Sequence, residues 1–423
     1  MPRETPDNRA SHSSLGPTGF HPAPAPAVET VLPIGREGRS ISIYPASAGY
    51  DLQRELDFLT NRAVEPNVFF TGRFLAPAMP RIEDRFIRLL LLRDEDGARS
   101  RLRFLMPFSV ERPGFAVGPS IMRVWANAFG PLGTPLLDAE DAGGSLDDLL
   151  DGLSQRTLGL PKVLVLPELR LDGHFAGLLR AIAISRGLSV VTIEPHTRPV
   201  LQSTLDGDAY LRGTLAKNHY REMKRQWRRL SESGSLSYEV ARQPDEIRSR
   251  FEEFLALETS GWKGRERTAM VVDRYRAAFA REAVNNLAEI DGVRIHTLDF
   301  DGVAIASMVV FLLSGEAYTW KTAYDESYSG YSPGKLLMMR LTEWHLDDAN
   351  ILRTDSCAVP DHPIMSRFWK ERAAMGTLVV GLDRQSDRDA RQVAAQMHLY
   401  QNTRNLARKL RDKVRSLARQ RKR

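Results

Sequence analysis

The segment from Ala304 to Leu346 most strongly constrains the fold of this chain. Two apolar runs at 303–313 and 317–324 are separated by the turn Ser314-Gly315-Glu316 and predict two neighbouring strands. The tetrapeptide Ser-Pro-Gly-Lys at 332–335 follows and predicts a helix start, because Ser is a good N-cap and Pro suits the first helical position. Helical spacing then continues through Leu336, Leu337, Arg340, Leu341 and Trp344.

This predicted helix start has the features of a phosphate site. Gly334 leaves the first turn without a side chain, and no Asp or Glu follows within that turn. The free N–H groups, the positive end of the helix dipole and Lys335 would together attract a pyrophosphate. A well-capped helix with no ligand is the alternative that the tetrapeptide alone leaves open.

The length and charge of the chain indicate two domains with a basic tail. With 423 residues the chain is long for one core. Residues 399–423 contain ten Lys or Arg and a single Asp, which gives that segment a charge of +9. Because the whole chain carries +6, the remainder carries −3. Attraction to anionic partners is therefore expected only at the C-terminus.

Cysteine, histidine and the N-terminal residues limit the class of protein further. Cys357 is the single cysteine, which excludes an intrachain disulfide and a cysteine-based zinc site. The histidines show no metal-ligand spacing, so no metal is expected. The N-terminus lacks the apolar core of a signal peptide, and no run approaches 18 apolar residues, which predicts a cytoplasmic protein.

The pattern of residues divides the chain into five parts. Residues 1–38 are rich in Pro, Ala, Ser and Gly and predict a disordered tail. Residues 39–205 predict a first α/β domain, and 206–235 a basic connecting helix. Residues 236–383 predict a second domain with the order β-α-α-β-β-β-α-β-α-β, which ends in a helix at 363–372 and a strand at 376–381. Residues 384–423 predict a basic helix with Leu399, Leu406, Leu410, Val414 and Leu417 on one face.

Four stretches of the chain, at 215–230, 254–270, 322–337 and 355–372, resemble the CelD-like acetyltransferases of the GNAT superfamily. This branch is often found near bacterial polysaccharide genes. It is related to the Fem-type aminoacyltransferases, which pair two GNAT-like domains. The resemblance covers about residues 40–383 and implies an α/β fold with tandem GNAT-like (acyl-CoA N-acyltransferase) domains.

The same resemblance implies roles for particular residues. Tyr331, Ser332, Pro333, Gly334 and Lys335 would bind the cofactor pyrophosphate. The strand at 320–323 would offer backbone N–H groups to a thioester carbonyl. Asp355 is the expected catalytic base, with capping of a turn as the alternative. Lys321 would stabilise negative charge or anchor an acidic acceptor, unless it is only a solvated side chain. The expected contacts to the acceptor are Trp262, Lys263, Trp320 and Tyr324.

Three other observations qualify this expected mechanism. His296 and His345 are read as structural, and Cys357 is not expected to act as a nucleophile because no paired His motif accompanies it. Residues 364–372 lack the Tyr that many GNAT enzymes use to protonate the leaving thiolate. Tyr324, Tyr328 and water remain the candidates for that acid.

The expected activity is transfer of an acyl group, acetyl being the expected one, from acyl-CoA to an amine or hydroxyl of a saccharide or cell-envelope precursor. One alternative is a Fem-like transferase that uses aminoacyl-tRNA, and another is a non-catalytic scaffold. The acceptor is expected to be a small molecule or a lipid-linked saccharide, and nucleic acid is not an expected partner. The basic C-terminal helix predicts contact with an anionic membrane surface, which would make the protein peripheral at the inner face.

Overall fold

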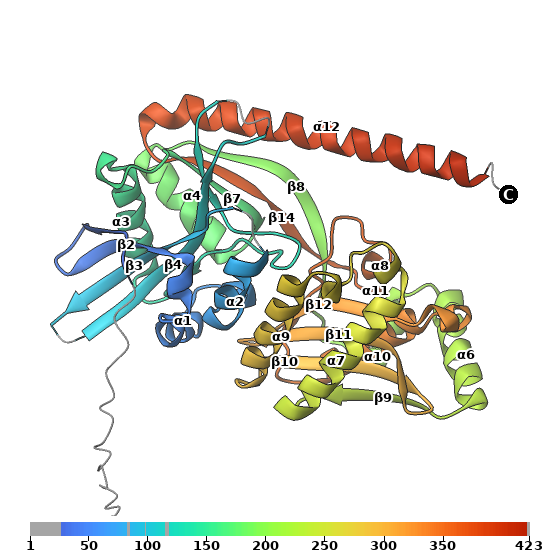
Figure 1. Ribbon diagram of the computed structural model, residues 1–423. Helices are drawn as coiled ribbons and strands as arrows, with labels where there is room; N and C mark the ends of the chain where they lie inside the picture. The colour runs from blue at the N-terminus through green and yellow to red at the C-terminus, as the bar shows by residue number, and fades with distance from the viewer. Residues whose placement is uncertain (1–26, 83–84, 98, 115–117, 421–423) are drawn as a thin grey trace, which may run out of the picture.

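The computed structural model describes residues 27–82, 85–97, 99–114 and 118–420, without the side chains of residues 405–420 (Figure 1). The disorder that the sequence predicts for residues 1–26 lies outside these residues. That prediction is wrong for 30–33, because Thr30–Pro33 forms strand β1 and pairs with Arg39–Pro45 (β2).

The N-terminal half contains most of its predicted elements. Its further strands are β3 (Arg88–Asp96), β4 (Arg99–Glu111), β5 (Ile121–Val124), β6 (Leu136–Leu137), β7 (Val163–Arg170) and β8 (Val190–Leu201). Its helices are α1 (Gln53–Thr60), α2 (Gly72–Ile82), α3 (Ala142–Ser154) and α4 (His174–Arg186). Helix α2 was not predicted, because two prolines at 77 and 80 interrupt its sequence pattern.

The C-terminal half follows the predicted order up to β13. Its elements are α5 (Gly207–Thr214), α6 (Lys217–Ser233), β9 (Leu236–Ala241), α7 (Pro244–Ser260), α8 (Trp262–Arg265), α9 (Arg274–Ala288), β10 (Val293–Phe300), β11 (Val303–Leu313), β12 (Glu316–Tyr324), α10 (Pro333–Asp347), β13 (Arg353–Asp355), α11 (Met365–Phe368), β14 (Glu371–Gly381) and α12 (Asp387–Gln420). The connecting helix is two helices, which separate at Leu215 and Ala216. The helix predicted at 363–372 is wrong for most of that range, because only α11 is helical and β14 starts at Glu371.

All of these strands belong to one sheet. Its order is β1-β2-β3-β4-β5-β7-β14-β8-β13-β12-β11-β10-β9, with β6 paired to β4. The strand predicted to close the second domain, at 376–381, is part of β14 and lies between β7 and β8 of the N-terminal half. The two halves therefore share a continuous sheet, and the last strand of the chain completes the first half.

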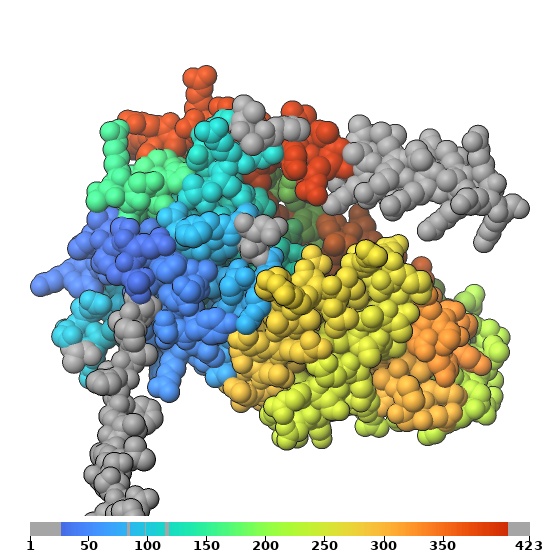
Figure 2. Space-filling model, viewed as in Figure 1, coloured from blue at the N-terminus to red at the C-terminus, as the bar shows by residue number. Residues whose placement is uncertain are grey.

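Helices cover both faces of the sheet in the C-terminal half, and in Figure 2 the yellow segment that contains α7 and α9 hides the sheet on the near face. Figure 1 shows α7 and α9 in front of β10 and β11, where Phe251, Phe279 and Val284 enter the core. Leu211, Met223 and Leu337, from α5, α6 and α10, pack with Met308 and Val310 of β11 in a separate apolar cluster. The edge of the ring of Phe74 in α2 meets Phe279 in α9, with centroids 5.3 Å apart, so aromatic packing also joins the two halves.

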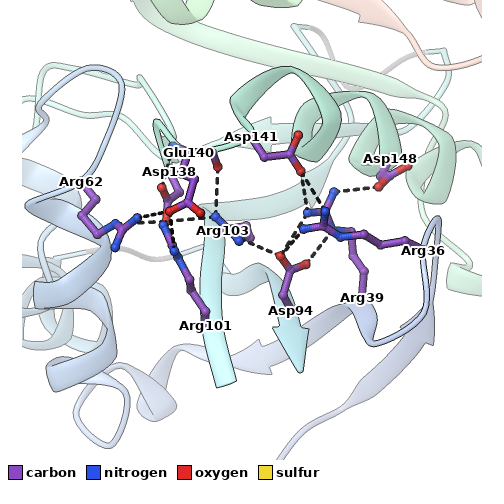
Figure 3. Close-up of polar contacts among 10 residues, drawn as sticks. All are labelled: Arg36, Arg39, Arg62, Asp94, Arg101, Arg103, Asp138, Glu140, Asp141 and Asp148. Atoms are coloured by element: carbon purple, nitrogen blue, oxygen red, sulfur yellow. Dashed lines mark hydrogen bonds and ion pairs between the residues drawn. The ribbon is translucent and has the colours of Figure 1, made fainter. Parts of the chain in front are cut away.

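A buried ion network fixes the outer edge of the N-terminal half (Figure 3). Arg39 of β2 is buried and donates to Asp94 of β3 at 2.7 Å, to Asp148 of α3 at 2.7 Å and to Asp141 at 3.0 Å. Asp94 also accepts from Arg103 of β4. Burial raises the pKa of the Asp94 carboxyl, but its arginine partners outweigh burial and hold that pKa well below its ordinary value.

Helix α12 covers the sheet where β14 enters. Val393, Ala394 and Met397 pack with Val165 of β7 and Val379 of β14. Leu399, on the predicted apolar stripe, is exposed. The side chains of Leu406, Leu410, Val414 and Leu417 lie outside the described residues, so the predicted stripe is not described beyond residue 404.

Candidate active site

Strands β12 and β13 form an opening in the sheet. They run parallel and pair only where Glu316, Ala317 and Tyr318 face Arg353, Thr354 and Asp355. Beyond this point the hydroxyl of Thr319 still donates to the Ser356 carbonyl oxygen at 2.8 Å. The following residues of β12, through Tyr324, no longer pair with β13, so one edge of the strand faces the opening. This is the segment in which the sequence predicts donors to a thioester.

The chain enters α10 through the short helix Glu326–Tyr331 and Ser332. The predicted N-cap role of the Ser332 side chain is wrong. Ser332 has φ 54° and ψ 53°, and its side chain makes no capping hydrogen bond. Its carbonyl oxygen instead accepts the N–H groups of Lys335 at 2.9 Å and Leu336 at 3.2 Å. Such a left-handed, non-glycine residue is strained, and strain of this kind concentrates where a backbone shape serves a ligand.

The surroundings of this helix start fit a pyrophosphate. A Cβ at Gly334 would lie 3.5 Å from the Tyr324 ring, and one at Gly330 would meet no atom within 4 Å, so the glycines leave open space. Burial lowers the pKa of the His219 ring in α6. The positive charges of Arg367 and Lys335 lower it further, so both cations act on that ring. Arg229 lies 5.8 Å from the centre of the Tyr331 ring. These residues would hold the phosphates of CoA, and Lys335 is the nearest cation to the helix start in sequence.

Asp355 lies at the end of β13, as predicted, but its partners were not predicted. It is fully buried, 3.3 Å from Arg170 of β7 and 3.6 Å from Arg198 of β8, and it accepts the Cys357 N–H at 2.8 Å. Burial raises the pKa of Asp355, but the two arginines and the N–H group lower it more, so the net shift is downward. A carboxylate held ionised in this way is a weak proton acceptor, and the geometry favours a role in positioning.

Lys321 lies between the two halves of the molecule. Its Nζ donates to the Ala128 carbonyl oxygen at 3.2 Å and lies 4.6 Å from the centre of the Phe129 ring. Desolvation, and then repulsion by Lys263, lower the pKa of Lys321 to about 8. Burial thus favours the neutral form of Lys321, which lies on the strand that borders the opening.

The other predicted contacts fall into different environments. Trp320 is buried, and its Nε1 donates to the Phe129 carbonyl oxygen at 2.7 Å, so its ring packs in the core. Lys263 donates to Glu258 at 2.9 Å and to the Thr322 carbonyl oxygen at 2.8 Å. Trp262 and Tyr324 are exposed, and Tyr324 borders Gly334. Trp262, Lys263 and Tyr324 line one small hollow, while Trp320 lies away from it.

Burial shifts the pKa values of the remaining candidates, His296, His345 and Cys357. His296 and His345 are buried and hydrogen-bonded to Tyr238 and Thr354 respectively, and burial lowers the pKa of both rings. Burial raises the pKa of the Cys357 thiol, which disfavours the nucleophilic thiolate. In the described part of the chain, no three His, Cys, Asp or Glu side chains form a metal-binding group. Within the same residues, no helix combines the length and hydropathy of a membrane span.

The comparisons with known proteins concern the fold and one domain of the chain. Residues 217–355 match the family model of the acetyltransferase (GNAT) domain. The structure of FemX is similar over 77% of this chain and 95% of that chain, with 7% identity and a TM-score of 0.52. A tandem GNAT protein from the clavulanic acid biosynthesis pathway matches over 80% and 98%, with 15% identity and a TM-score of 0.38. The C-terminal domain of a putative lysylphosphatidylglycerol synthetase from Agrobacterium fabrum matches over 82% and 96%, with 12% identity and a TM-score of 0.49. A search of curated proteins finds no match.

The chain thus has the tandem GNAT-like fold that the sequence predicts, and its matched GNAT domain contains the opening and the helix start described above. Residues 217–355 therefore form a GNAT-type acyltransferase domain within the chain.

Proposed function

We propose that the protein transfers an acyl group, acetyl in the first instance, from acyl-CoA to an amine or hydroxyl of a saccharide or cell-envelope precursor. The observation that supports this most directly is the strained helix start at Ser332–Lys335 beside the unpaired edge of β12. The Gly334 N–H group, open space at Gly330 and Gly334 and nearby cations suit a pyrophosphate, while the strand edge suits a carbonyl. The saccharide acceptor follows from the resemblance to CelD-like acetyltransferases.

The geometry supports direct attack on the donor. Bound acyl-CoA supplies an activated thioester carbonyl. The exposed backbone edge of β12 between Trp320 and Ala323 stabilises the negative charge that develops on the carbonyl oxygen. The acceptor nitrogen or oxygen forms a bond to the carbonyl carbon and gives up one proton, while the carbon–sulfur bond breaks and the sulfur takes up one proton. The products are the acylated acceptor and free CoA.

Aminoacyl-tRNA is the alternative donor. The fold is shared with FemX, and α6 carries basic residues from Lys217 to Arg229. Two observations favour CoA instead. Open space at the glycines of the helix start suits one pyrophosphate, and the matched family model is that of an acetyltransferase domain.

A substitution at Gly334 tests the donor. Gly334→Glu places a carboxylate where the phosphates would bind, and we expect acetyl-CoA affinity to fall by at least about 100-fold. Gly334→Ala is the matched control, because its Cβ makes only ordinary contact with Tyr324. We expect it to retain affinity within about threefold. Isothermal titration calorimetry measures both.

Failure of wild-type protein to bind acetyl-CoA, together with tight and salt-sensitive binding of aminoacyl-tRNA, would overturn the proposal. Equal CoA affinity in the wild type and Gly334→Glu would show that CoA binds elsewhere.

A further inference from the structure

A cavity of about 750 Å³ lies between the N-terminal half, the loop after β13 and helix α12. Strands β5 and β7 run parallel and pair only at Met122 and Arg123 with Leu164 and Val165. Beyond this contact the cavity begins, with Ala126 and Ala128 on one side and Pro167 and Glu168 on the other. The cavity therefore occupies an opening in the N-terminal half that resembles the opening between β12 and β13. Its volume is within the range of small-molecule sites.

The cavity borders the proposed thioester site. Ala128 and Cys357 both line it. The Ala128 carbonyl oxygen accepts a hydrogen bond from the Lys321 ammonium group of β12. Cys357 directly follows Ser356, whose carbonyl oxygen accepts a hydrogen bond from the Thr319 hydroxyl of β12. Among the described residues none of β12 lines the cavity itself, so Ala128 and Cys357 form the wall that separates a molecule in the cavity from the proposed thioester site.

Backbone strain is concentrated in the cavity wall. Glu168 has φ 51°, Glu194 has φ 52° and Cys357 has φ 49°. Glu168 and Glu194 coincide with register shifts in β7 and β8, on the two sides of β14. A β-bulge turns a side chain out of the regular alternation of a strand, and bulges occur preferentially beside functional sites. Here both bulges bring a carboxylate to the cavity lining.

The wall formed by β7 and β8 holds these carboxylates together with a buried arginine. Arg198 is 2% exposed and donates to Glu168 at 2.7 Å, yet its Nε and Nη1 atoms have no hydrogen-bond partner among the described residues. His196 lies 3.6 Å from the same Glu168 oxygen. Burial raises the pKa of Glu194, because the charged form is desolvated there. With two Glu and one Arg, this wall carries a formal charge of −1.

A second part of the lining, the basic wall, is rich in arginine. Arg85, Arg112 and Arg123 lie there with Glu111, and Arg404 reaches the cavity from α12. Arg123 lies 3.6 Å from Glu111, beyond hydrogen-bond distance. Four Arg and one Glu give this wall a formal charge of +3. The cavity thus offers carboxylates and guanidinium groups together, and the charge of Arg123 also acts on Glu194.

We propose that this cavity binds the acceptor, and that the acceptor is a small amine that also carries a phosphate group. The ammonium group lies against Glu168 and Glu194, and the phosphate is bound by Arg112 and Arg123. A phosphate monoester carries close to two negative charges at neutral pH, which suits the basic wall. The proposal rests on the proposed function, because it gives the cavity a partner in the reaction on β12.

Three related probes separate the two recognition elements. Glucosamine 6-phosphate carries both groups, glucosamine lacks the phosphate, and N-acetylglucosamine 6-phosphate lacks the ammonium. Affinities are measured by calorimetry on full-length protein saturated with CoA, so that the phosphate site at α10 is filled. The same titrations on CoA-free Gly334→Glu protein keep this test independent of whether CoA binds.

We expect glucosamine 6-phosphate to bind at least about tenfold more tightly than glucosamine or N-acetylglucosamine 6-phosphate. Arg112→Gln and Arg123→Gln should each remove most of the gain from the phosphate. Glu194→Gln should remove most of the gain from the ammonium and leave the gain from the phosphate. The matched control Arg248→Gln changes an exposed arginine of α7 outside the cavity and should leave both gains in place.

Arg112 is exposed, so its substitution should not disturb folding. If Arg123→Gln disturbs folding, the affinity of Arg112→Gln for the three probes decides the result. The proposal is overturned if neither group improves binding, or if both gains survive in the cavity variants. If the protein binds CoA but shows no preference for the phosphorylated amine, the cavity proposal is wrong and the proposed function stands. If the protein prefers the phosphorylated amine but does not bind CoA, the proposed donor is wrong and the proposed cavity site stands.

Discussion

At the scale of single residues, Asp355 shows how one side chain can join two halves of a chain. It ends β13 of the C-terminal half, while Arg170 and Arg198 come from β7 and β8 of the N-terminal half. Arg170 also pairs with Glu316 of β12 at 2.6 Å. Without the charge of Asp355, two buried arginines lose part of the negative charge that neutralises them. The loss of stability is far larger than for a surface ion pair.

We therefore expect Asp355→Asn to lower the free energy of unfolding by about 3–5 kcal/mol, measured by urea denaturation at pH 7. Because the folded-state pKa of Asp355 is depressed, its contribution is present above the unfolded pKa of about 4 and is lost as the pH falls through the folded value. The gap between wild type and variant should shrink in acid. The control Asp245→Asn, at an exposed site on α7, should stay within about 0.5 kcal/mol of wild type. Unchanged stability with a large loss of kcat would instead identify Asp355 as the base.

The position of Asp355 was predictable from sequence, and its environment was not. A short strand after a helix is a local signal, whereas the Arg170 contact joins residues 185 positions apart. An arginine inside an apolar strand, as in the run Val163–Arg170, was the available signal for a buried ion pair. The bulges at Glu168 and Glu194 left no such signal, because they arise from pairing with β14.

At the scale of elements, the start of α10 is held by backbone geometry. The capping rules placed this helix correctly, since Pro333 is its first residue, but they assigned Ser332 a hydrogen bond that it does not make. Strands β10, β11 and β12 were also predicted to within a residue or two, because their periodicity is local. Strand β14 was predicted in part, but its neighbours β7 and β8 depend on contacts across most of the chain.

The left-handed conformation of Ser332 leads to a test of this helix start. Ser332→Gly should leave the free energy of unfolding unchanged or raise it by up to about 1 kcal/mol, because glycine adopts positive φ without strain. If the Ser332 hydroxyl did cap the helix, loss of the side chain would instead destabilise the protein. Thermal unfolding monitored by circular dichroism distinguishes these outcomes, with Ser329→Gly as a control for serine at a neighbouring position. Acetyl-CoA affinity should persist in Ser332→Gly, since the Gly334 N–H group and the Lys335 side chain remain in place.

At the scale of the whole molecule, the two halves are joined in three ways. Strand β14 lies inside the sheet of the N-terminal half, Arg170 pairs with carboxylates of the C-terminal half, and the aromatic contact of Phe74 with Phe279 spans the interface. In the proposed arrangement Ala128 and Cys357 separate the acceptor cavity from the donor site, and Lys321 of β12 donates to the Ala128 carbonyl oxygen. A rigid junction keeps an acceptor amine and a thioester in register, which is how positioning lowers a barrier.

We accordingly expect one cooperative unfolding transition for the full chain, with calorimetric and van't Hoff enthalpies in agreement. Phe74→Ala should lower the free energy of unfolding by about 3–5 kcal/mol, since it removes a buried ring at the junction, and the transition should remain single. Phe58→Ala, at an exposed position on α1, is the control and should change little. Two separate transitions in the wild type, or destabilisation of one half alone in Phe74→Ala, would show that the halves fold independently despite the shared sheet. In that case β14 would connect the two halves without coupling their stabilities. The relative position of acceptor and donor would then depend on the ion pairs of Arg170.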